Sequence, residues 1–206
     1  MQRLMKPRLL ILASGTPNGG GSGFENLVQN VTAADIVGVV SNNENGGVRE
    51  RAERLGVPFI YFPGPYTAEN YQKIVKETGA DFVALSGWLK LVAGLDPKTT
   101  FNIHPGPLPE FGGKGLWGRF VHEAVLKAYT EGRIKESAVS MHFVTPEFDE
   151  GPVFFSHPVP ILPEDTADTL AERVQAAEKE WQPKVTDKIV RGEITWDGIH
   201  KDSLHV

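Results

Sequence analysis

The sequence predicts a single α/β domain whose central sheet is mainly parallel and flanked by helices. Short apolar segments alternate with segments of helical spacing through the first half of the chain. This alternation is typical of parallel strands joined by right-handed crossover helices. The length of 206 residues suits one such domain, and it is large enough to bury most of the unfolded surface. No internal repeat or linker divides the chain, so we predict one domain over residues 1–206.

The first half of the chain shows the clearest alternation. Residues 9–13 have the pattern of a buried parallel strand. A glycine-rich loop follows and leads to a helix that begins at Ser22. Ser22 and Glu25 have the spacing of a capping box. Further strands are expected at residues 36–40, 59–62 and 82–85, and further helices at residues 48–55 and 71–77.

The second half contains more strands and fewer helices. A strand over residues 100–104 runs into a proline-rich loop, and strands over 137–144 and 153–161 flank a turn. Helices are expected at 116–129 and 167–190, the second from apolar residues that recur every three or four positions. Pro183 lies inside the second helix, where we expect it to kink or divide the helix.

Composition excludes several classes of function. The formal net charge is −5, and an acidic chain of this size is not expected to neutralise a nucleic-acid backbone. The chain has no cysteine, which excludes disulfides, zinc–thiolate sites and thiol nucleophiles. The apolar run at 9–13 is too short to span a membrane, and no signal-peptide pattern is present. We therefore expect a cytoplasmic protein that acts on small molecules, with no nucleic-acid or membrane partner.

The glycine-rich loop is a candidate phosphate site. Five glycines between Gly15 and Gly23 allow the backbone to approach a ligand closely. A helix N-terminus after such a loop favours an anion. The alternative is a flexible strand-to-helix turn, and the carboxylate of Glu25 would disfavour an anion there. The glycine spacing fits neither the nicotinamide fingerprint nor the P-loop.

Three further groups of polar residues are candidates for chemistry. Asn102 and His104 share one face of a strand end, where they could stabilise an oxyanion and transfer a proton. Alternatively, they form a polar strand end with satisfied hydrogen bonds. Asp149 lies in a turn, where aspartate is expected for structural reasons alone. Gln175 and Glu178 are i,i+3 neighbours, and the ordinary place for such a pair is a solvated helix face.

Histidine spacing gives no sign of a metal site. The six histidines do not have the spacing of metal ligands, so we predict no metal. His142, within a predicted strand, is interpreted as a core or surface residue.

Taken in order, these segments resemble the phosphoribosylglycinamide formyltransferase family from residue 9 to about residue 195. The Asn-x-His-Pro motif at Asn102 and the Asp-x-Gly-Pro motif at Asp149 are typical of folate formyltransferases. The helix with Gln175 and Glu178 is typical of the branch that acts on glycinamide ribonucleotide. Other matching segments are LILASG at 10–15, VSN at 40–42, VALSGWLK at 83–90 and SMHFV at 140–144.

The resemblance implies a Rossmann-like formyltransferase domain and assigns roles to named residues. The implied reaction moves the formyl group of 10-formyltetrahydrofolate to the amine of glycinamide ribonucleotide, by direct attack through a tetrahedral intermediate, in de novo purine biosynthesis. The implied catalytic residues are Asn102, His104 and Asp149. The implied folate-binding residues are Leu89, Lys90, Leu91, Val92, Asn102, Thr145, Pro146, Glu147, Phe148 and Asp149. The implied ribonucleotide-binding residues are Gly21, Ser22, Gly23, Gln175 and Glu178.

The chain departs from the family pattern in three loops. Residues 16–20 lengthen the glycine-rich loop, and Gly23 stands where the family often has asparagine. Ala68 occupies the approximate place of a basic residue. The loop after Pro109 is longer than usual and contains Lys114, which could supply a compensating cation.

Other functions remain open alternatives. A formyltransferase for initiator tRNA is expected to need an extra C-terminal domain, and a formyl-folate hydrolase an extra N-terminal domain; the 206 residues leave room for neither. Sugar-nucleotide formyltransferases share Asn-x-His but are expected to lack the helix with Gln175 and Glu178. A non-catalytic nucleotide-binding module is the alternative from a different class of function.

Overall fold

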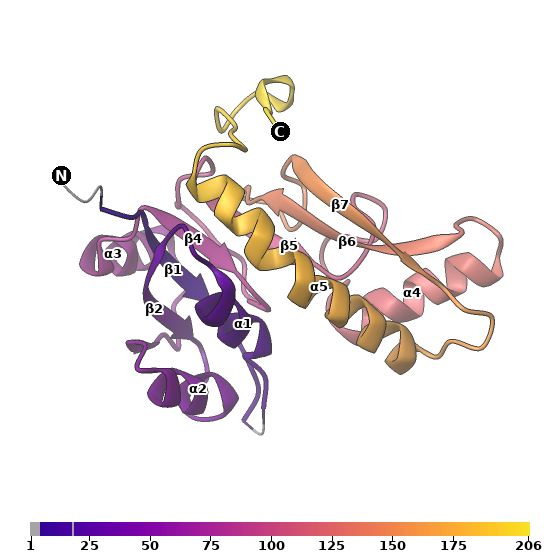
Figure 1. The fold of residues 1–206 in the computed structure, drawn as a ribbon, viewed down its shortest axis with the longest axis horizontal. Coiled ribbons are helices and arrows are strands. Elements are labelled where there is room, and N and C mark those ends of the chain that lie inside the picture. The colour runs from indigo at the N-terminus through magenta and orange to yellow at the C-terminus, as the bar shows by residue number, and fades with distance from the viewer. Residues whose placement is uncertain (1–4, 18) are drawn as a thin grey trace.

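The computed structural model describes residues 5–17 and 19–206, so predictions that involve residues 1–4 or Asn18 lie outside the described residues. The described strands form one seven-stranded sheet with helices on both faces (Figure 1). The strands are β1 (Arg8–Leu12), β2 (Asp35–Ser41), β3 (Phe59–Tyr61), β4 (Phe82–Leu85), β5 (Thr100–His104), β6 (Glu136–Phe143) and β7 (Val153–Pro160). The helices are α1 (Ser22–Asn30), α2 (Gly47–Leu55), α3 (Ala68–Thr78), α4 (Arg119–Thr130), α5 (Ala167–Val190) and the short 3-10 helix η1 (Lys201–Ser203).

The sheet has the order β3-β2-β1-β4-β5-β6-β7 and is mainly parallel, which confirms the predicted fold class. The pairs from β3 to β5 are all parallel, whereas β5–β6 and β6–β7 are antiparallel. The strand β7 returns beside β6 because a short turn joins them, and short turns connect antiparallel strands. This turn contains Asp149 and lies next to the end of β5.

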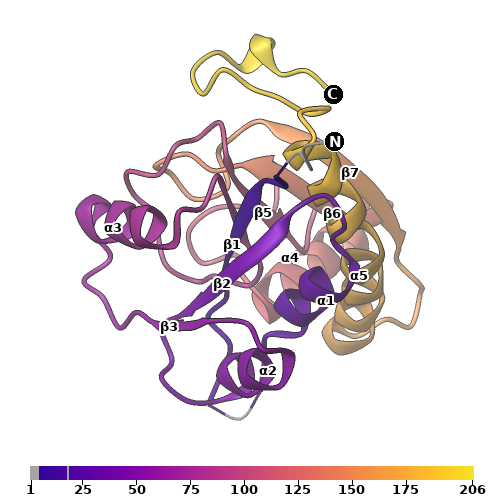
Figure 2. The ribbon, with the colours of Figure 1, turned by 60° about the vertical axis from the view of Figure 1, so that its left-hand side comes forward.

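Alternating side chains of β1 divide the interior into two apolar layers. Leu9 and Ile11 face the layer that α1, α2, α4 and α5 cover, and Leu10 and Leu12 face the layer beneath α3. Figure 2 shows α3 separated from the other helices by the sheet. Because both faces are covered, the central strands are apolar on both sides, which is why they appear as continuous apolar runs in the sequence.

Helix α1 begins at Ser22 as predicted, but the capping box is not formed: Gly21 is the N-cap residue, with a φ of 80° and no side-chain cap among the described residues. Helix α4 begins at Arg119 rather than near residue 116, because Gly118 has a φ of 54° and interrupts the helical backbone. In contrast, α5 begins at its expected position, where Thr166 accepts a hydrogen bond from the backbone N–H of Thr169.

Helix α5 runs without division past Pro183 and spans both halves of the sheet (Figure 1). Proline has no N–H, so the carbonyl four residues earlier, that of Lys179, loses its helical partner. The side chain of Asn26 on α1 donates Nδ2–H to this carbonyl at 2.9 Å. Of the two expected effects of Pro183, a kink or a division, the division does not occur, and a neighbouring helix satisfies the carbonyl that the proline leaves without a helical partner.

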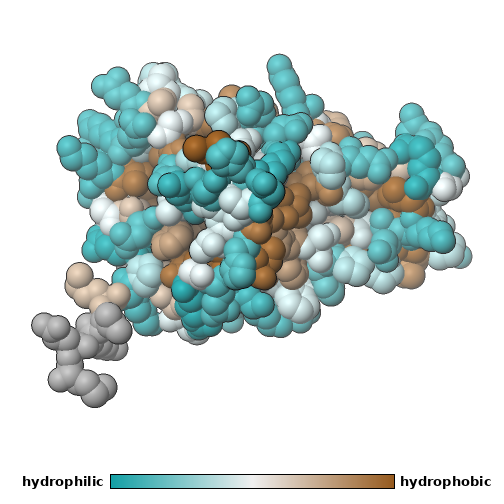
Figure 3. Space-filling model, turned by 90° about the horizontal axis from the view of Figure 1, so that it is seen from above, coloured by the Kyte–Doolittle hydropathy of each residue, from teal (hydrophilic) through white to brown (hydrophobic). Residues whose placement is uncertain are grey.

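The face of the molecule shown in Figure 3 is covered largely by hydrophilic side chains, with hydrophobic side chains visible between them. This mixture is ordinary for a protein surface in water. None of the helices within residues 5–17 and 19–206 has the length and apolar character needed to cross a bilayer.

Candidate active site

A cleft of about 450 Å³ opens where β4 and β5 end, between the start of α1 and the inner face of α5. This is the edge at which parallel sheets of α/β proteins bind their ligands. All the predicted site residues except Pro146 line the cleft, and Pro146 lines a smaller cavity beside it. Segments far apart in the sequence are thus brought together, as the motifs predicted.

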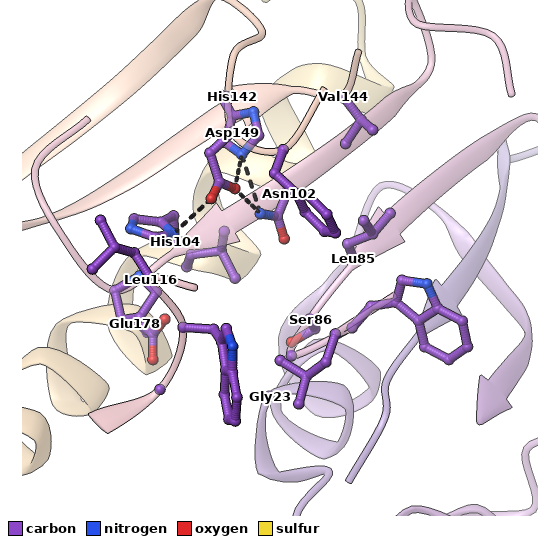
Figure 4. Close-up of a pocket in the computed structure, with 18 of the residues that line it drawn as sticks. Gly23, Leu85, Ser86, Asn102, His104, Leu116, His142, Val144, Asp149 and Glu178 are labelled. Carbon is purple, nitrogen blue, oxygen red and sulfur yellow. Dashed lines mark hydrogen bonds and ion pairs between the residues drawn. The ribbon is translucent and has the colours of Figure 1, made fainter. Parts of the chain in front are cut away.

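At one end of the cleft, Asn102, His142 and Asp149 form a tight cluster (Figure 4). Asn102 and His142 face each other in register on β5 and β6. The amide Nδ2 of Asn102 lies 3.1 Å from His142 Nε2 and 3.4 Å from Asp149 Oδ1. His142 Nδ1 lies 2.8 Å from the Phe143 carbonyl, which can only accept, so Nδ1 carries a proton.

Asp149 is held by its backbone and by four neighbours, Asn102, His104, Gly113 and His142. Its φ of 57° places it in the left-handed region, which aspartate and asparagine tolerate better than most residues. Its Oδ2 accepts the backbone N–H of Gly113 at 2.9 Å, and its Oδ1 lies 3.3 Å from His142 Nε2. Burial alone would raise the pKa of Asp149, but the contacts with His142, His104 and Gly113 hold that pKa below its ordinary value. The carboxylate is therefore ionised at neutral pH.

His104 lies beneath Asp149 and is almost fully buried. Its Nε2 lies 2.8 Å from the Phe111 carbonyl and its Nδ1 lies 3.6 Å from Asp149 Oδ2. Burial lowers the pKa of His104 below its ordinary value, while the charge of Asp149 and the Phe111 carbonyl oppose that change. In the resting protein the ring is therefore neutral at pH 7, with its proton on Nε2. An imidazolium would gain its second proton on Nδ1, facing the carboxylate.

The middle of the cleft has exposed apolar walls. Leu89, Leu91 and Phe148 are among the large hydrophobic side chains with the most exposure, and all three line the cleft. Exposed apolar groups inside a concave site favour a flat, largely apolar ligand. Beneath them, the Trp88 indole donates to the Tyr71 hydroxyl, which donates to the Leu91 carbonyl at 3.0 Å. This chain of hydrogen bonds fixes the predicted folate segment from below.

At the other end of the cleft lies the start of α1. The first N–H groups of a helix have no partner within the helix, and no side chain within residues 5–17 and 19–206 caps them. Gly20 and Gly21 have φ values of 83° and 80°, a conformation that glycine adopts without strain. The loop therefore presents free backbone donors at a helix N-terminus, which suits an anion.

Glu25, which was expected to oppose an anion at this place, is paired with two arginines. Arg51 Nε lies 2.8 Å from its Oε2, and Arg54 Nη2 lies 2.7 Å from its Oε1. The hydrogen bond from Arg54 is the largest cause of a lowered pKa for this carboxyl, although burial opposes it. Arg51 also donates to the Gly20 carbonyl at 2.8 Å, which ties the glycine-rich loop to α2. The negative charge is thus balanced before any ligand binds.

Two predicted residues of α5 line the third wall of the cleft. Gln175 is exposed and Glu178 is partly buried. Burial among the surrounding atoms raises the pKa of Glu178 to about 7. These side chains therefore face the cleft rather than the solvated outer face of the helix.

A family model described as formyl transferase matches residues 7–186. The chain belongs to the formyl transferase family. It is 34% identical over 199 residues to the chloroplastic phosphoribosylglycinamide formyltransferase of Arabidopsis thaliana. The matched region covers 88% of this chain and 67% of the plant protein. It is also 28% identical to the trifunctional purine biosynthetic protein adenosine-3 of Gallus gallus, covering 92% of this chain but only 19% of that protein.

Solved structures of the formyl transferase family have the same fold. The crystal structure of phosphoribosylglycinamide formyltransferase from Anaplasma phagocytophilum matches with a TM-score of 0.78 and 29% sequence identity. The matched region covers 96% of this chain and 92% of the Anaplasma phagocytophilum chain. The resemblance found in the sequence is therefore confirmed, and the protein is a formyl-transferring enzyme by family. Enzymes of this family use a formyl donor of the folate type.

Sequence reasoning missed one residue of this formyl transferase site. His142 was interpreted as a core or surface residue, yet it contacts both Asn102 and Asp149. A histidine within a predicted strand was the available signal, but its partner could be found only once β6 was paired with β5. Lys114, proposed as a compensating cation, does line the cleft. Within the described residues, no three acidic or histidine side chains gather as metal ligands.

Proposed function

We propose that the protein transfers the formyl group of 10-formyltetrahydrofolate to the amine of glycinamide ribonucleotide, a step of de novo purine biosynthesis. The observation that carries the proposal is the convergence of Asn102, His104 and Asp149 in one cleft. The apolar walls of that cleft suit a pterin, and the uncapped start of α1 suits a phosphate. The names of the relatives support the same acceptor.

In the proposed reaction, the neutral glycinamide nitrogen attacks the formyl carbon on N10 of the folate. A carbon–nitrogen bond forms, and negative charge develops on the formyl oxygen of a tetrahedral intermediate. The Asn102 amide lines the cleft and is the candidate donor to that oxygen. One of its two N–H groups would exchange its present acceptor for the formyl oxygen, and the long 3.4 Å contact with Asp149 is the one most readily given up. Collapse of the intermediate breaks the bond to N10.

One proton must pass from the attacking amine to N10 during this reaction. His104 is the candidate carrier, directly or through water. Burial disfavours its imidazolium, and the ionised Asp149 favours it. We infer that Asp149 makes the protonated state of His104 accessible when the proton is needed. The proposal includes neither a metal nor a covalent enzyme intermediate.

Two other functions are separated from this one by direct assay. The protein is mixed with glycinamide ribonucleotide and 10-formyltetrahydrofolate, and deformylated folate is measured. N-formylglycinamide ribonucleotide, which has the phosphate but no free amine, is the control acceptor. We expect release only with the free amine. Release without any acceptor would indicate a hydrolase, and no release with tight nucleotide binding would indicate a binding module.

The predicted cytoplasmic location belongs to the same proposal. Cell fractionation with detection of the protein tests it, and recovery in a membrane or organelle fraction would contradict it.

A further inference from the structure

At the phosphate end of the cleft, Gly23 is a glycine for a reason other than backbone conformation. It lies in the first turn of α1 with a helical backbone, where glycine weakens a helix. A β-carbon built at Gly23 would overlap the hydroxyl of Ser86, at the end of β4. Figure 4 shows Gly23 and Ser86 on the side of the cleft away from Asp149. The missing side chain therefore makes room for Ser86.

Ser86 in turn orients a buried amide on α5. Its hydroxyl donates to Oε1 of Gln182 at 3.3 Å. Gln182 is only 2% exposed, and both residues line the cleft. Because Oε1 faces Ser86, the amino group Nε2 lies on the other branch of the carboxamide.

That amino group has no acceptor among the described protein groups. Within residues 5–17 and 19–206, no side chain or carbonyl accepts from Gln182 Nε2, and the atom is not closed off from solvent. A ligand oxygen that enters the cleft could therefore accept its hydrogen bond in place of water. The Gln182 amide lies close to the start of α1, because a β-carbon built at Gly23 would be 3.5 Å from Gln182 Oε1, and both residues line the cleft.

We propose that Gln182 is a substrate-binding residue, oriented by Ser86, which donates a hydrogen bond to an oxygen of the ribose phosphate group of the acceptor. The inference rests on the proposed function for the identity of the acceptor. It does not rest on formyl transfer, because ribose 5-phosphate alone contains the group that would be recognised. Ser86 acts through Gln182 and is a positioning residue.

The test is calorimetric binding of ribose 5-phosphate and of glycinamide ribonucleotide to the full chain and three variants. Gln182→Met keeps the length of the side chain without the donor. Gln182→Glu keeps an acceptor for Ser86 but places a carboxylate where the donor was. Thr186→Val is the matched control, because Thr186 is buried one turn further along α5, its hydroxyl has no partner among the described residues, and it does not line the cleft.

We expect Gln182→Met to bind both ligands about tenfold more weakly, the effect of one lost hydrogen bond to an anion. Gln182→Glu should bind more weakly still, and Thr186→Val should bind like the wild type. Wild-type affinity in either Gln182 variant would overturn the inference, as would a wild-type protein that binds neither ligand. If the wild type binds ribose 5-phosphate with this pattern but transfers no formyl group, the proposed function fails and the inference stands.

Discussion

The two ends of the cleft obtain their chemistry from different parts of the chain. At the proposed catalytic end, Asn102, His142 and Asp149 come from two neighbouring strands and a turn, and their side chains contact one another. At the proposed phosphate end, the candidate donors are backbone N–H groups that Gly20 and Gly21 leave accessible. Side-chain chemistry requires particular residues and so leaves a motif. Backbone chemistry requires a conformation, which several sequences can supply.

The variant with the largest expected effect, Asp149→Asn, tests whether activity depends on the charge of one carboxylate. Asp149→Asn removes the carboxylate but suits the φ of 57° equally well. The charge of Asp149 raises the pKa of His104, so its loss should lower that pKa further. We expect kcat at neutral pH to fall roughly 10²–10⁴-fold, the usual contribution of a proton-transfer group. The remaining activity should move to lower pH, measured as kcat against pH for both proteins. Normal turnover with an unchanged profile would remove Asp149 from the catalytic set.

His142→Phe tests whether side chains at this end fix one another. The ring volume remains, but Asn102 and Asp149 each lose a partner. Loss of one or two such hydrogen bonds should reduce kcat about 10–100-fold. The contact with His142 lowers the pKa of Asp149, so that pKa should rise and activity should be lost at a higher pH during acidification.

The control for that variant is His122→Phe. His122 is also buried, on α4, but it does not line the cleft. Turnover should stay near that of the wild type. Because His122 and His104 repel each other when both are charged, the pH profile should move slightly toward higher pH at most. Equal losses in the two variants would mean that a buried histidine supports the fold rather than the reaction.

Gly21→Val tests whether the phosphate end depends on conformation. The φ of 80° disfavours valine, and a β-carbon there would lie 3.0 Å from Val48 Cγ2. The KM for glycinamide ribonucleotide should rise about tenfold, since a few kcal/mol of strain would displace the loop. The KM for the folate should change little. Gly132→Val is the control, because Gly132 has a φ of 72° with open space around it, far from the cleft lining. Equal weakening of both substrates by Gly21→Val would contradict the assignment.

The smallest expected effect tests the close approach of α1 to β4. Gly23→Ala should displace the Ser86 hydroxyl and weaken ribonucleotide binding severalfold, by disturbing Gln182. Adding Ser86→Ala leaves the nearest atoms at about 3.5 Å, which is ordinary contact. The double variant should therefore bind no more weakly than Ser86→Ala alone, because residues in contact are not additive. Additive losses would show that Gly23 matters for another reason.

Much of the fold was predictable because the spacing of apolar residues along the chain follows which side chains are buried. The apolar run at residues 9–13 predicted a strand covered on both faces, and β1 is covered on both faces. The capping box at Ser22 was wrong because Glu25 has stronger partners in Arg51 and Arg54, which come from another helix. The division at Pro183 was wrong for the same physical reason: Asn26, distant in sequence, satisfies the carbonyl of Lys179. Local spacing does not reveal partners supplied from elsewhere in the fold.

In the candidate site, too, residues in local motifs were predictable, whereas residues that depend on distant partners were not. The Asn102 and Asp149 motifs predicted the catalytic cluster, whose roles remain predictions. His142 could not be recognised before strand pairing placed it opposite Asn102. Gln182 gave no signal at all, since its significance depends on the bond from Ser86 and on the open space at Gly23.

The unbroken course of α5 has a consequence for the size of acceptor that fits. Gln175, Glu178 and Gln182 follow an i, i+3, i+7 spacing, so they form a row along one face of the helix. Exposure falls along the row, from an exposed Gln175 to a buried Gln182. At 1.5 Å per residue the row is about 10 Å long. If Gln182 binds the phosphate as proposed, this row sets the distance between the bound phosphate and the amine of the acceptor. We then expect a shorter or longer acceptor to place its amine away from the formyl carbon.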